Sequence, residues 1–149
     1  MSTRIEAADG RHWPEVRALL AAAGLPTADL GEADMSAFLV AFNGPDLVAA
    51  IALQRQGTVG LLRSLVVAED WRGKGVGADL CQALEARALE LGVSELWLLT
   101  TDAGPFFARY GFSLQSRDDA PAAIADSEEF QALCPASAEL YCKKTGMPA

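Results

Sequence analysis

A glycine-rich turn between two contrasting apolar segments most constrains how this chain can fold. The turn reads Arg-Gly-Lys-Gly-Val-Gly, residues 72–77. The segment before it, Leu61 to Val67, is almost continuously apolar, which is typical of a buried strand. The segment after it, Val76 to Leu91, has apolar residues at helical spacing and is followed by a glycine. A strand, a glycine-rich turn and a helix N-terminus together present backbone amides to an anion, most often a phosphate.

Hydrophobic periodicity and turn residues predict a mixed α/β chain. Strands are expected over residues 3–8, 36–42, 47–54, 58–67, 95–100, 112–115 and 138–143, and helices over 13–23, 76–91, 105–110 and part of 122–133. The turn sequences at 43–46 and 56–57 join three consecutive strands into a meander. We therefore expect one domain, residues 1–149, whose central sheet is largely antiparallel.

Charge and composition narrow the classes of partner. The formal net charge is -8 and the basic residues are thinly spread, which argues against nucleic acid and anionic membranes. No apolar run approaches the roughly 18 residues of a membrane span, and the N-terminus lacks the pattern of a signal peptide, so a cytoplasmic protein is expected. Cys81, Cys134 and Cys142 form no CxxC pair, and His12 has no cluster of partners. We therefore expect neither a disulfide framework nor a metal site.

Two other phosphate-binding patterns fit the turn less well. Gly73-x-Gly75-x-x-Ala78 formally matches the dinucleotide fingerprint. However, the preceding strand is the third of a meander, no βαβ unit surrounds it, and Asp102 comes late for a ribose contact. A P-loop is excluded because no Lys-Ser or Lys-Thr pair ends the turn.

Two ordered motifs distinguish the turn from these alternatives. Arg72-x-x-Gly75-x-Gly77 follows an apolar strand, and about 30 residues later the strand Leu96 to Thr101 leads into Phe-Phe-Ala-Arg-Tyr-Gly-Phe, residues 106–112. Together these segments resemble the landmarks of the GNAT superfamily, the Gcn5-related N-acetyltransferases, clearly over residues 47–117. The second motif is also similar to the acetyltransferase domain of N-acetylglutamate synthases, and the compact layout with its late segment 133–138 is similar to small GNATs of arsenic-resistance operons.

This resemblance implies a fold, a cosubstrate and a set of binding residues. The fold would be a mostly antiparallel sheet of six to seven strands with flanking helices, and the strand 96–100 would splay away to leave a slot for the thioester. Acetyl-CoA would be the cosubstrate, with no metal. The residues expected to bind it are Leu65, Val66 and Val67, which pair with the pantetheine arm, and Arg72, Gly73, Lys74, Gly75, Val76 and Gly77, which hold the pyrophosphate.

The expected reaction is direct attack of an amine on the thioester, with backbone amides near Val67 polarising the carbonyl. In many family members a tyrosine four residues before the glycine of Gly-Phe protonates the leaving thiolate. Phe107 occupies that position here and cannot donate a proton. Tyr110 is the remaining catalytic candidate, although it lies almost a full turn further along. Because Phe107 replaces the usual tyrosine, a second function stays open, that of an acyl-CoA-binding sensor or regulatory module.

The resemblance also implies a small amine as acceptor, one that is amino-acid-like and carries a carboxylate. Arg63 is the first candidate for a bidentate clamp on that carboxylate, because it shares strand parity with Leu65 and Val67. Ser137, at the mouth of the last strand, is the second. The acidic loop 25–34 keeps a polyamine or drug-like amine as an alternative acceptor. A monomer or homodimer is expected.

Overall fold

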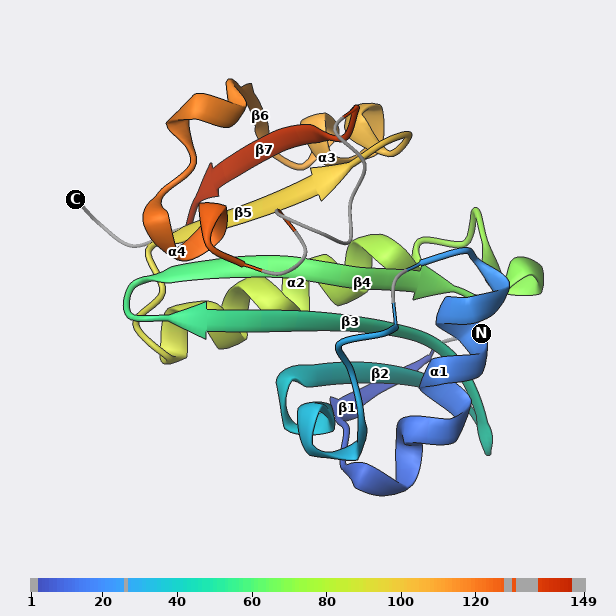
Figure 1. Ribbon diagram of the computed structural model, residues 1–149. Helices are drawn as coiled ribbons and strands as arrows, with labels where there is room; N and C mark the ends of the chain where they lie inside the picture. Colours follow the sequence, from blue (N-terminus) through green and yellow to red (C-terminus); the bar gives the residue numbers. More distant parts are fainter. Residues whose placement is uncertain (1–2, 26, 128–129, 131–136, 146–149) are drawn as a thin grey trace. The chain divides into compact units, whose positions relative to one another are not determined.

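The computed structural model describes residues 3–25, 27–127, 130 and 137–145. Its seven strands are hydrogen-bonded in the order β1-β2-β3-β4-β5-β7-β6 (Figure 1). The strands are β1 (Arg4–Ala7), β2 (Phe38–Asn43), β3 (Asp46–Gln56), β4 (Val59–Val67), β5 (Glu95–Thr100), β6 (Ser113–Gln115) and β7 (Glu139–Lys144). The α-helices are α1 (Trp13–Ala22), α2 (Val76–Glu90), α3 (Gly104–Arg109) and α4 (Ala122–Ala125). The pairs β1–β2, β2–β3, β5–β7 and β6–β7 are antiparallel and β4–β5 is parallel, which confirms the predicted fold class.

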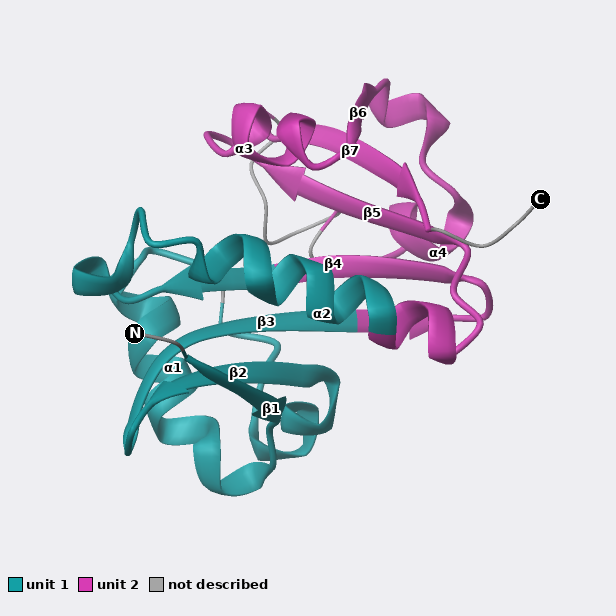
Figure 2. Cartoon of the chain, turned by 180° about the vertical axis from the view of Figure 1, so that it is seen from behind, with its two compact units in different colours: residues 1–53, 64–86 teal, residues 54–63, 87–149 magenta. Residues whose placement is uncertain are grey.

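The chain divides into two compact units (Figure 2). Unit 1 comprises residues 1–53 and 64–86, and unit 2 comprises residues 54–63 and 87–149. Strand β4 passes from unit 2 into unit 1 between Arg63 and Ser64. The organisation of the chain as one domain stays a prediction.

Unit 1 is built on the hairpin of β2 and β3. Asn43 lies opposite Asp46, so Gly44 and Pro45 form the turn, and Gly44 adopts the left-handed conformation that a glycine permits, with a φ of 59°. Figures 1 and 2, seen from opposite sides, place α1 on one face of this part of the sheet and α2 on the other.

The core of unit 1 forms where α1 meets alternate residues of β2 and β3. Its buried members are Ala8, Val16, Leu20, Met35, Phe38, Val40, Phe42, Leu47, Ala50, Ala52 and Val66. Fully burying a side chain such as Leu20 stabilises the fold by about 1.5–3 kcal/mol relative to its exposure. The inclusion of Val66 anchors the end of β4 in this core.

Unit 2 is organised around β7, which lies between β5 and β6. Tyr141 of β7 faces Leu98 of β5 on one side and Leu114 of β6 on the other. A second apolar cluster covers one face of these strands, and its buried members are Leu61, Trp97, Ile124, Leu140 and Cys142. The first residues of β4 join this unit through parallel pairing, from Val59↔Glu95 to Leu61↔Trp97.

One predicted boundary was wrong for a local reason. The strand expected from Ser36 begins only at Phe38, because residues 32–37 form a 3-10 helix in which the Asp34 carboxylate accepts the Gly31 N–H at 2.8 Å. The short helix expected within part of 122–133 is confirmed by α4, Ala122–Ala125. Just beyond it, the Ser127 hydroxyl donates to the Ile124 carbonyl at 2.6 Å, and part of the predicted span lies outside the described residues.

Candidate functional site

The glycine-rich turn lies wholly in unit 1, between the end of β4 and the start of α2. A short 3-10 helix, Glu69–Trp71, follows the strand, and α2 begins at Val76. Gly73 and Gly75 have φ values of 76° and 85°, in the left-handed region where an L side chain is strained. A Cβ built on either glycine meets no heavy atom of the described residues within 4 Å. These glycines therefore serve a backbone conformation, and the space beside them is open to a ligand.

The amides of the first turn of α2 have no partner inside the helix, as at every helix N-terminus. The Gly75 carbonyl accepts the Asp79 N–H at 3.0 Å, which closes the first helical turn directly on the glycine. The start of a 15-residue helix carries a partial positive charge, which favours a bound anion.

The two cations of the turn have different surroundings. The Arg72 side chain donates from Nε to the Val67 carbonyl at 3.0 Å, so it ties the turn to the end of β4. Lys74 is exposed and its Nζ lies 5.1 Å from the centre of the Trp71 ring, within cation–π range. Both side chains are exposed, and Arg72 has a structural contact that the sequence did not predict.

The end of β4 presents its backbone next to the turn. Val66 points into the core of unit 1, whereas Leu65 and Val67 are half-buried. The Ala68 N–H donates to the Val48 carbonyl at 2.7 Å, so this end of the strand is held against β3. The three residues predicted to line the cofactor therefore form a regular strand end in the same unit as the turn.

A left-handed residue interrupts β4 just before this segment. Ser64 has a φ of 60°, the one positive φ recorded for a residue other than glycine in the described part of the chain. Such a residue marks a bulge that breaks the alternation of side chains along a strand. The parity argument that linked Arg63 to Leu65 and Val67 crosses this break and therefore does not hold.

Arg63 is instead placed by Leu61, two residues earlier along regular strand. Residues two apart on a strand share a face, so Arg63 lies on the face of β4 that carries Leu61 and the apolar cluster of unit 2. The side chain is 3% exposed and has an interaction partner within the structure. A buried arginine on this face stays a candidate for binding a carboxylate.

The short helix α3 holds an aromatic cluster. Phe107 is 4% exposed and packs edge-on against Phe106 and Phe112, with ring centres 5.1 and 5.5 Å away. Tyr110 follows the helix, is 40% exposed and lies over Phe106 with ring centres 5.0 Å apart. The position four residues before Gly111 is thus a buried apolar ring, and Tyr110 presents the accessible hydroxyl of this segment.

Ser137 is exposed in the turn that leads into β7 and belongs to unit 2, as Arg63 does. The neighbouring Ala138 is buried, and its carbonyl accepts a hydrogen bond from Arg117 Nη1 at 2.9 Å. The two predicted acceptor residues therefore belong to the same unit, and one of them lies next to an anchored backbone.

The remaining candidate ligands and nucleophiles have structural surroundings. Burial, and secondarily the Glu95 charge, raise the pKa of the Cys142 thiol to about 11, so it stays protonated near neutral pH. Cys81 is buried, and Cys134 lies outside the described residues. Within the described ranges, no three His, Cys, Asp or Glu side chains are placed to hold a metal ion. None of the helices searched there is long and apolar enough to cross a membrane.

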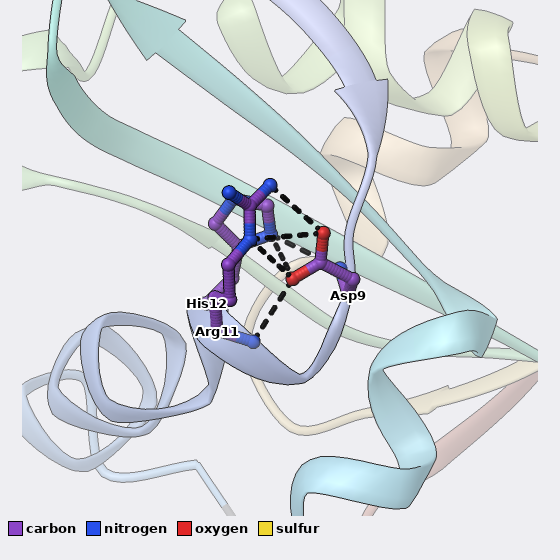
Figure 3. A network of polar contacts seen from close by, with 3 residues as sticks. All are labelled: Asp9, Arg11 and His12. Carbon is purple, nitrogen blue, oxygen red and sulfur yellow. Dashed lines mark hydrogen bonds and ion pairs between the residues drawn. The ribbon is translucent and has the colours of Figure 1, made fainter.

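His12 caps the chain between β1 and α1 (Figure 3). Its Nδ1 accepts the Asp9 N–H at 3.0 Å, and its ring lies edge-on to Phe42. The Asp9 carboxylate accepts from the Arg11 side chain at 3.0 Å, and this bond is the main reason why the pKa of Asp9 falls to about 2. The imidazole acts here as a capping group.

Comparison with known proteins identifies the family. Residues 8–112 match the Acetyltransferase (GNAT) family. The chain belongs to this family. The amino-acid acetyltransferase of Azotobacter vinelandii is 31% identical over 102 residues, which cover 67% of this chain and 24% of that protein. The amino-acid acetyltransferase of Ralstonia nicotianae is 33% identical over 117 residues, covering 76% and 23%. The chain thus spans about a quarter of the length of these curated relatives.

Solved structures show the same GNAT fold. N-acetylglutamate synthase from Neisseria gonorrhoeae, complexed with coenzyme A and N-acetyl-glutamate, matches with a TM-score of 0.86 and 21% identity over 99% of this chain and 36% of that chain. A Mycobacterium tuberculosis protein in complex with CoA matches with a TM-score of 0.80 and 20% identity, covering 95% of this chain and 98% of that one. The predicted likeness to N-acetylglutamate synthases is confirmed, and the likeness to arsenic-operon GNATs stays a prediction.

Two contacts were not predicted from the sequence, one in the glycine-rich turn of unit 1 and one in unit 2. Trp71 escaped notice because its contact with Lys74 is a ring contact outside the glycine pattern. Arg117 is half-buried and donates to carbonyls 13 and 21 residues away in the sequence. The position of Trp71 close to basic residues in the sequence could have indicated its contact with Lys74. No local sequence pattern indicates the contacts of Arg117.

Proposed function

We propose that this chain transfers the acetyl group of acetyl-CoA to the amine of a small, amino-acid-like acceptor. The observation that carries the proposal is the turn of residues 72–77, where two left-handed glycines leave open space at the start of a long helix. Coenzyme A carries a pyrophosphate, which such backbone amides bind well. The CoA complexes of similar folds and the amino-acid acetyltransferases among the relatives support this choice.

Unit 1 would hold the donor. The backbone of Leu65, Val66 and Val67 would pair with the pantetheine arm as an added strand, and the amides of Gly73 to Gly77 would bind the pyrophosphate. Lys74 and Arg72 would supply the cations, since Arg72 keeps its charge and its Nη donors while Nε is bonded to the Val67 carbonyl. The Nε bond would also keep the turn in place against the strand.

The reaction would proceed by direct attack. The neutral amine nitrogen forms a bond to the thioester carbonyl carbon, the carbon–sulfur bond breaks, the amine loses a proton, and the thiolate gains one. Backbone N–H groups near Val67 would stabilise the developing negative charge on the carbonyl oxygen. A thiol pKa of about 8.5 lets the thiolate leave with modest assistance. Tyr110 would give that assistance, since the buried Phe107 ring has no proton to donate.

Unit 2 would hold the acceptor through Arg63 and Ser137. A guanidinium binds a carboxylate through two parallel hydrogen bonds, and a serine hydroxyl adds a further donor. Arg63 is the last residue of β4 that belongs to unit 2, whereas Leu65 belongs to unit 1.

Phe107 favours one second function, an acyl-CoA-binding sensor or regulatory module. A buried phenyl ring at the position where many GNAT members carry a tyrosine removes the usual proton donor. Such a module would bind acetyl-CoA through the same turn and would release its thiol no faster in the presence of an amine.

A thiol-release assay over a panel of amines separates these functions. The panel contains acidic, neutral and basic amino acids together with a polyamine and an aminoglycoside, at fixed acetyl-CoA. We expect one or more amino acids to accelerate thiol release, with the acetylated product identified by mass spectrometry. Acceleration by the polyamine or aminoglycoside alone would shift the acceptor class to cationic amines. Binding of acetyl-CoA without acceleration by any amine would establish the sensor.

A thermal-shift measurement tests the donor separately. A ligand at 100 times its dissociation constant stabilises the folded chain by about 2.7 kcal/mol. We expect acetyl-CoA and CoA to raise the melting temperature, whereas a shift with NAD alone would overturn the donor assignment.

A further inference from the structure

Arg117 holds two distant parts of unit 2 together. Its Nη1 donates to the Ala138 carbonyl at 2.9 Å and its Nη2 to the Phe130 carbonyl at 3.4 Å. The guanidinium also lies 4.4 Å from the centre of the Phe130 ring. One half-buried side chain thus fixes the backbone at two points that are eight residues apart in the sequence.

Only the geometry of a guanidinium suits this arrangement. Its planar fork carries five N–H donors in fixed directions, so two carbonyls can be bound while the flat face stacks on a ring. A lysine keeps the charge but offers a single nitrogen on a flexible stem. The contacts of Arg117 therefore depend on shape as well as on charge.

Both anchored points adjoin the proposed acceptor residues. Ala138 follows Ser137 directly, so the bond to its carbonyl restrains the peptide that carries the serine. Phe130 packs against the apolar cluster of unit 2 that contains Leu61 and Trp97. Arg63 follows Leu61 by two residues, so it lies on the face of β4 that contributes Leu61 to this same cluster.

Direct binding of the acceptor by Arg117 is the less favoured reading. Both terminal nitrogens already donate to carbonyls and one face of the guanidinium is covered by a ring. Two of the five N–H donors and one face of the guanidinium are therefore already engaged within the chain. The side chain is therefore better suited to placing its neighbours than to contacting a substrate.

We propose that Arg117 is a positioning residue for the acceptor, which sets the place of Ser137 and of the Phe130 ring. This inference rests on the proposed acetyltransferase function and on Ser137 as an acceptor contact. Arg117 would then control the affinity for the acceptor and leave the binding of acetyl-CoA unchanged.

The test compares Arg117→Ala and Arg117→Lys with Arg109→Ala, an exposed arginine of the same unit that serves as the control for net charge. Steady-state kinetics give KM for the acceptor and for acetyl-CoA separately. We expect Arg117→Ala to raise the acceptor KM by about tenfold or more, the factor associated with losing a hydrogen bond to a charged group. Acetyl-CoA KM should stay within about twofold, and Arg109→Ala should change neither value.

Arg117→Lys decides between shape and charge, and it carries the test if the alanine variant does not fold. We expect it to raise the acceptor KM nearly as much as the alanine variant does. An acceptor KM unchanged in Arg117→Lys would overturn the proposal, because charge alone would then suffice. The proposal would also be overturned if either variant changed the melting temperature but kept a normal acceptor KM. Arg117 would then have a purely structural role.

A double-mutant cycle with Ser137→Ala tests the route of the effect. If Arg117 acts through Ser137, its removal in the Ser137→Ala background should raise the acceptor KM by less than about threefold. Full additivity of the two changes would overturn the proposed route. A wild-type chain that acetylates no amine would instead defeat the proposed function, an outcome distinct from an active wild type with a normal Arg117→Ala variant.

Discussion

The proposed donor turn of unit 1 and the proposed acceptor residues of unit 2 are built in opposite ways. The turn is one continuous stretch, residues 72–77, whose conformation follows from its own glycines. The acceptor residues come from separate places, Arg63 on β4 and Ser137 before β7, and depend on contacts made across the unit. A site encoded in one segment can be found by a pattern, whereas a site assembled from distant segments depends on the fold around it.

The largest effect is expected from a change in the turn. Gly75→Glu forces a side chain onto a backbone with a φ of 85° and adds a negative charge where the pyrophosphate would lie. We expect affinity for CoA to fall by more than about 100-fold, measured by isothermal titration calorimetry.

Gly57→Glu is the matched control, because Gly57 also has a positive φ of 62° and open space among the described residues. It lies in the turn between β3 and β4. Affinity for CoA should be unchanged in this variant. Equal losses in both variants would remove the donor site from the turn and erase the contrast between the two regions.

A change at Arg63 probes the distributed site. Arg63→Lys keeps the charge but loses the bidentate geometry for a carboxylate. We expect the acceptor KM to rise by about tenfold to thirtyfold with little change in CoA affinity, measured by steady-state kinetics and calorimetry. A loss of CoA affinity with a normal acceptor KM would move Arg63 to the donor side.

A smaller effect is expected at Tyr110. Tyr110→Phe removes the accessible hydroxyl after α3 while keeping the ring that lies over Phe106. We expect kcat to fall by about tenfold, less than general acid catalysis often contributes, because the thiolate is a fair leaving group unaided. Both KM values should stay unchanged. Phe107→Tyr in that background should restore part of kcat, and a normal kcat in Tyr110→Phe would assign the residue to packing alone.

The smallest effect concerns the stability of unit 1. The hydrogen bond from Arg11 lowers the pKa of Asp9 from 3.8 to about 2, so the charged carboxylate stabilises the folded state. This contribution is complete above the unfolded pKa near 4 and is lost as the pH falls through about 2. We expect Asp9→Asn to lower the melting temperature by about 2 °C or less at pH 7, since the pair is exposed.

The difference should shrink as the pH approaches 2, which a melting series from pH 7 to pH 2 measures. Asp46→Asn, which removes another exposed carboxylate from unit 1, is the control. A pH-independent effect of Asp9→Asn would show that the carboxylate acts through its shape as a cap instead of its charge.

The regular elements were predictable because their signals are local. Strand β5 coincides with the predicted span, and α2 starts at the predicted residue, since each has a strong apolar pattern bounded by turn residues. The 3-10 helix before β2 was missed because a single capping contact from Asp34 outweighs the strand pattern there.

As with the helices and strands, only the locally encoded parts of the candidate site were predictable from the sequence. The glycines and the start of α2 made the turn of residues 72–77 predictable. By contrast, nothing in the strand-forming residues of β4 indicates that Ser64 has a left-handed backbone. The clamp of Arg117 involves partners 13 and 21 residues away, beyond the reach of any periodic pattern. Contacts of that kind come only from the tertiary fold.

The insertion of β7 between β5 and β6 has a consequence for the order of folding. During synthesis from the N-terminus, residues 1–53 and 64–86 of unit 1 are complete before any residue of β5 has been made. The sheet of unit 2 must wait for residues 139–144, because β5 and β6 share no edge until β7 arrives between them. The nascent chain therefore finishes unit 1, which carries the proposed donor turn, well before unit 2, which carries Ser137.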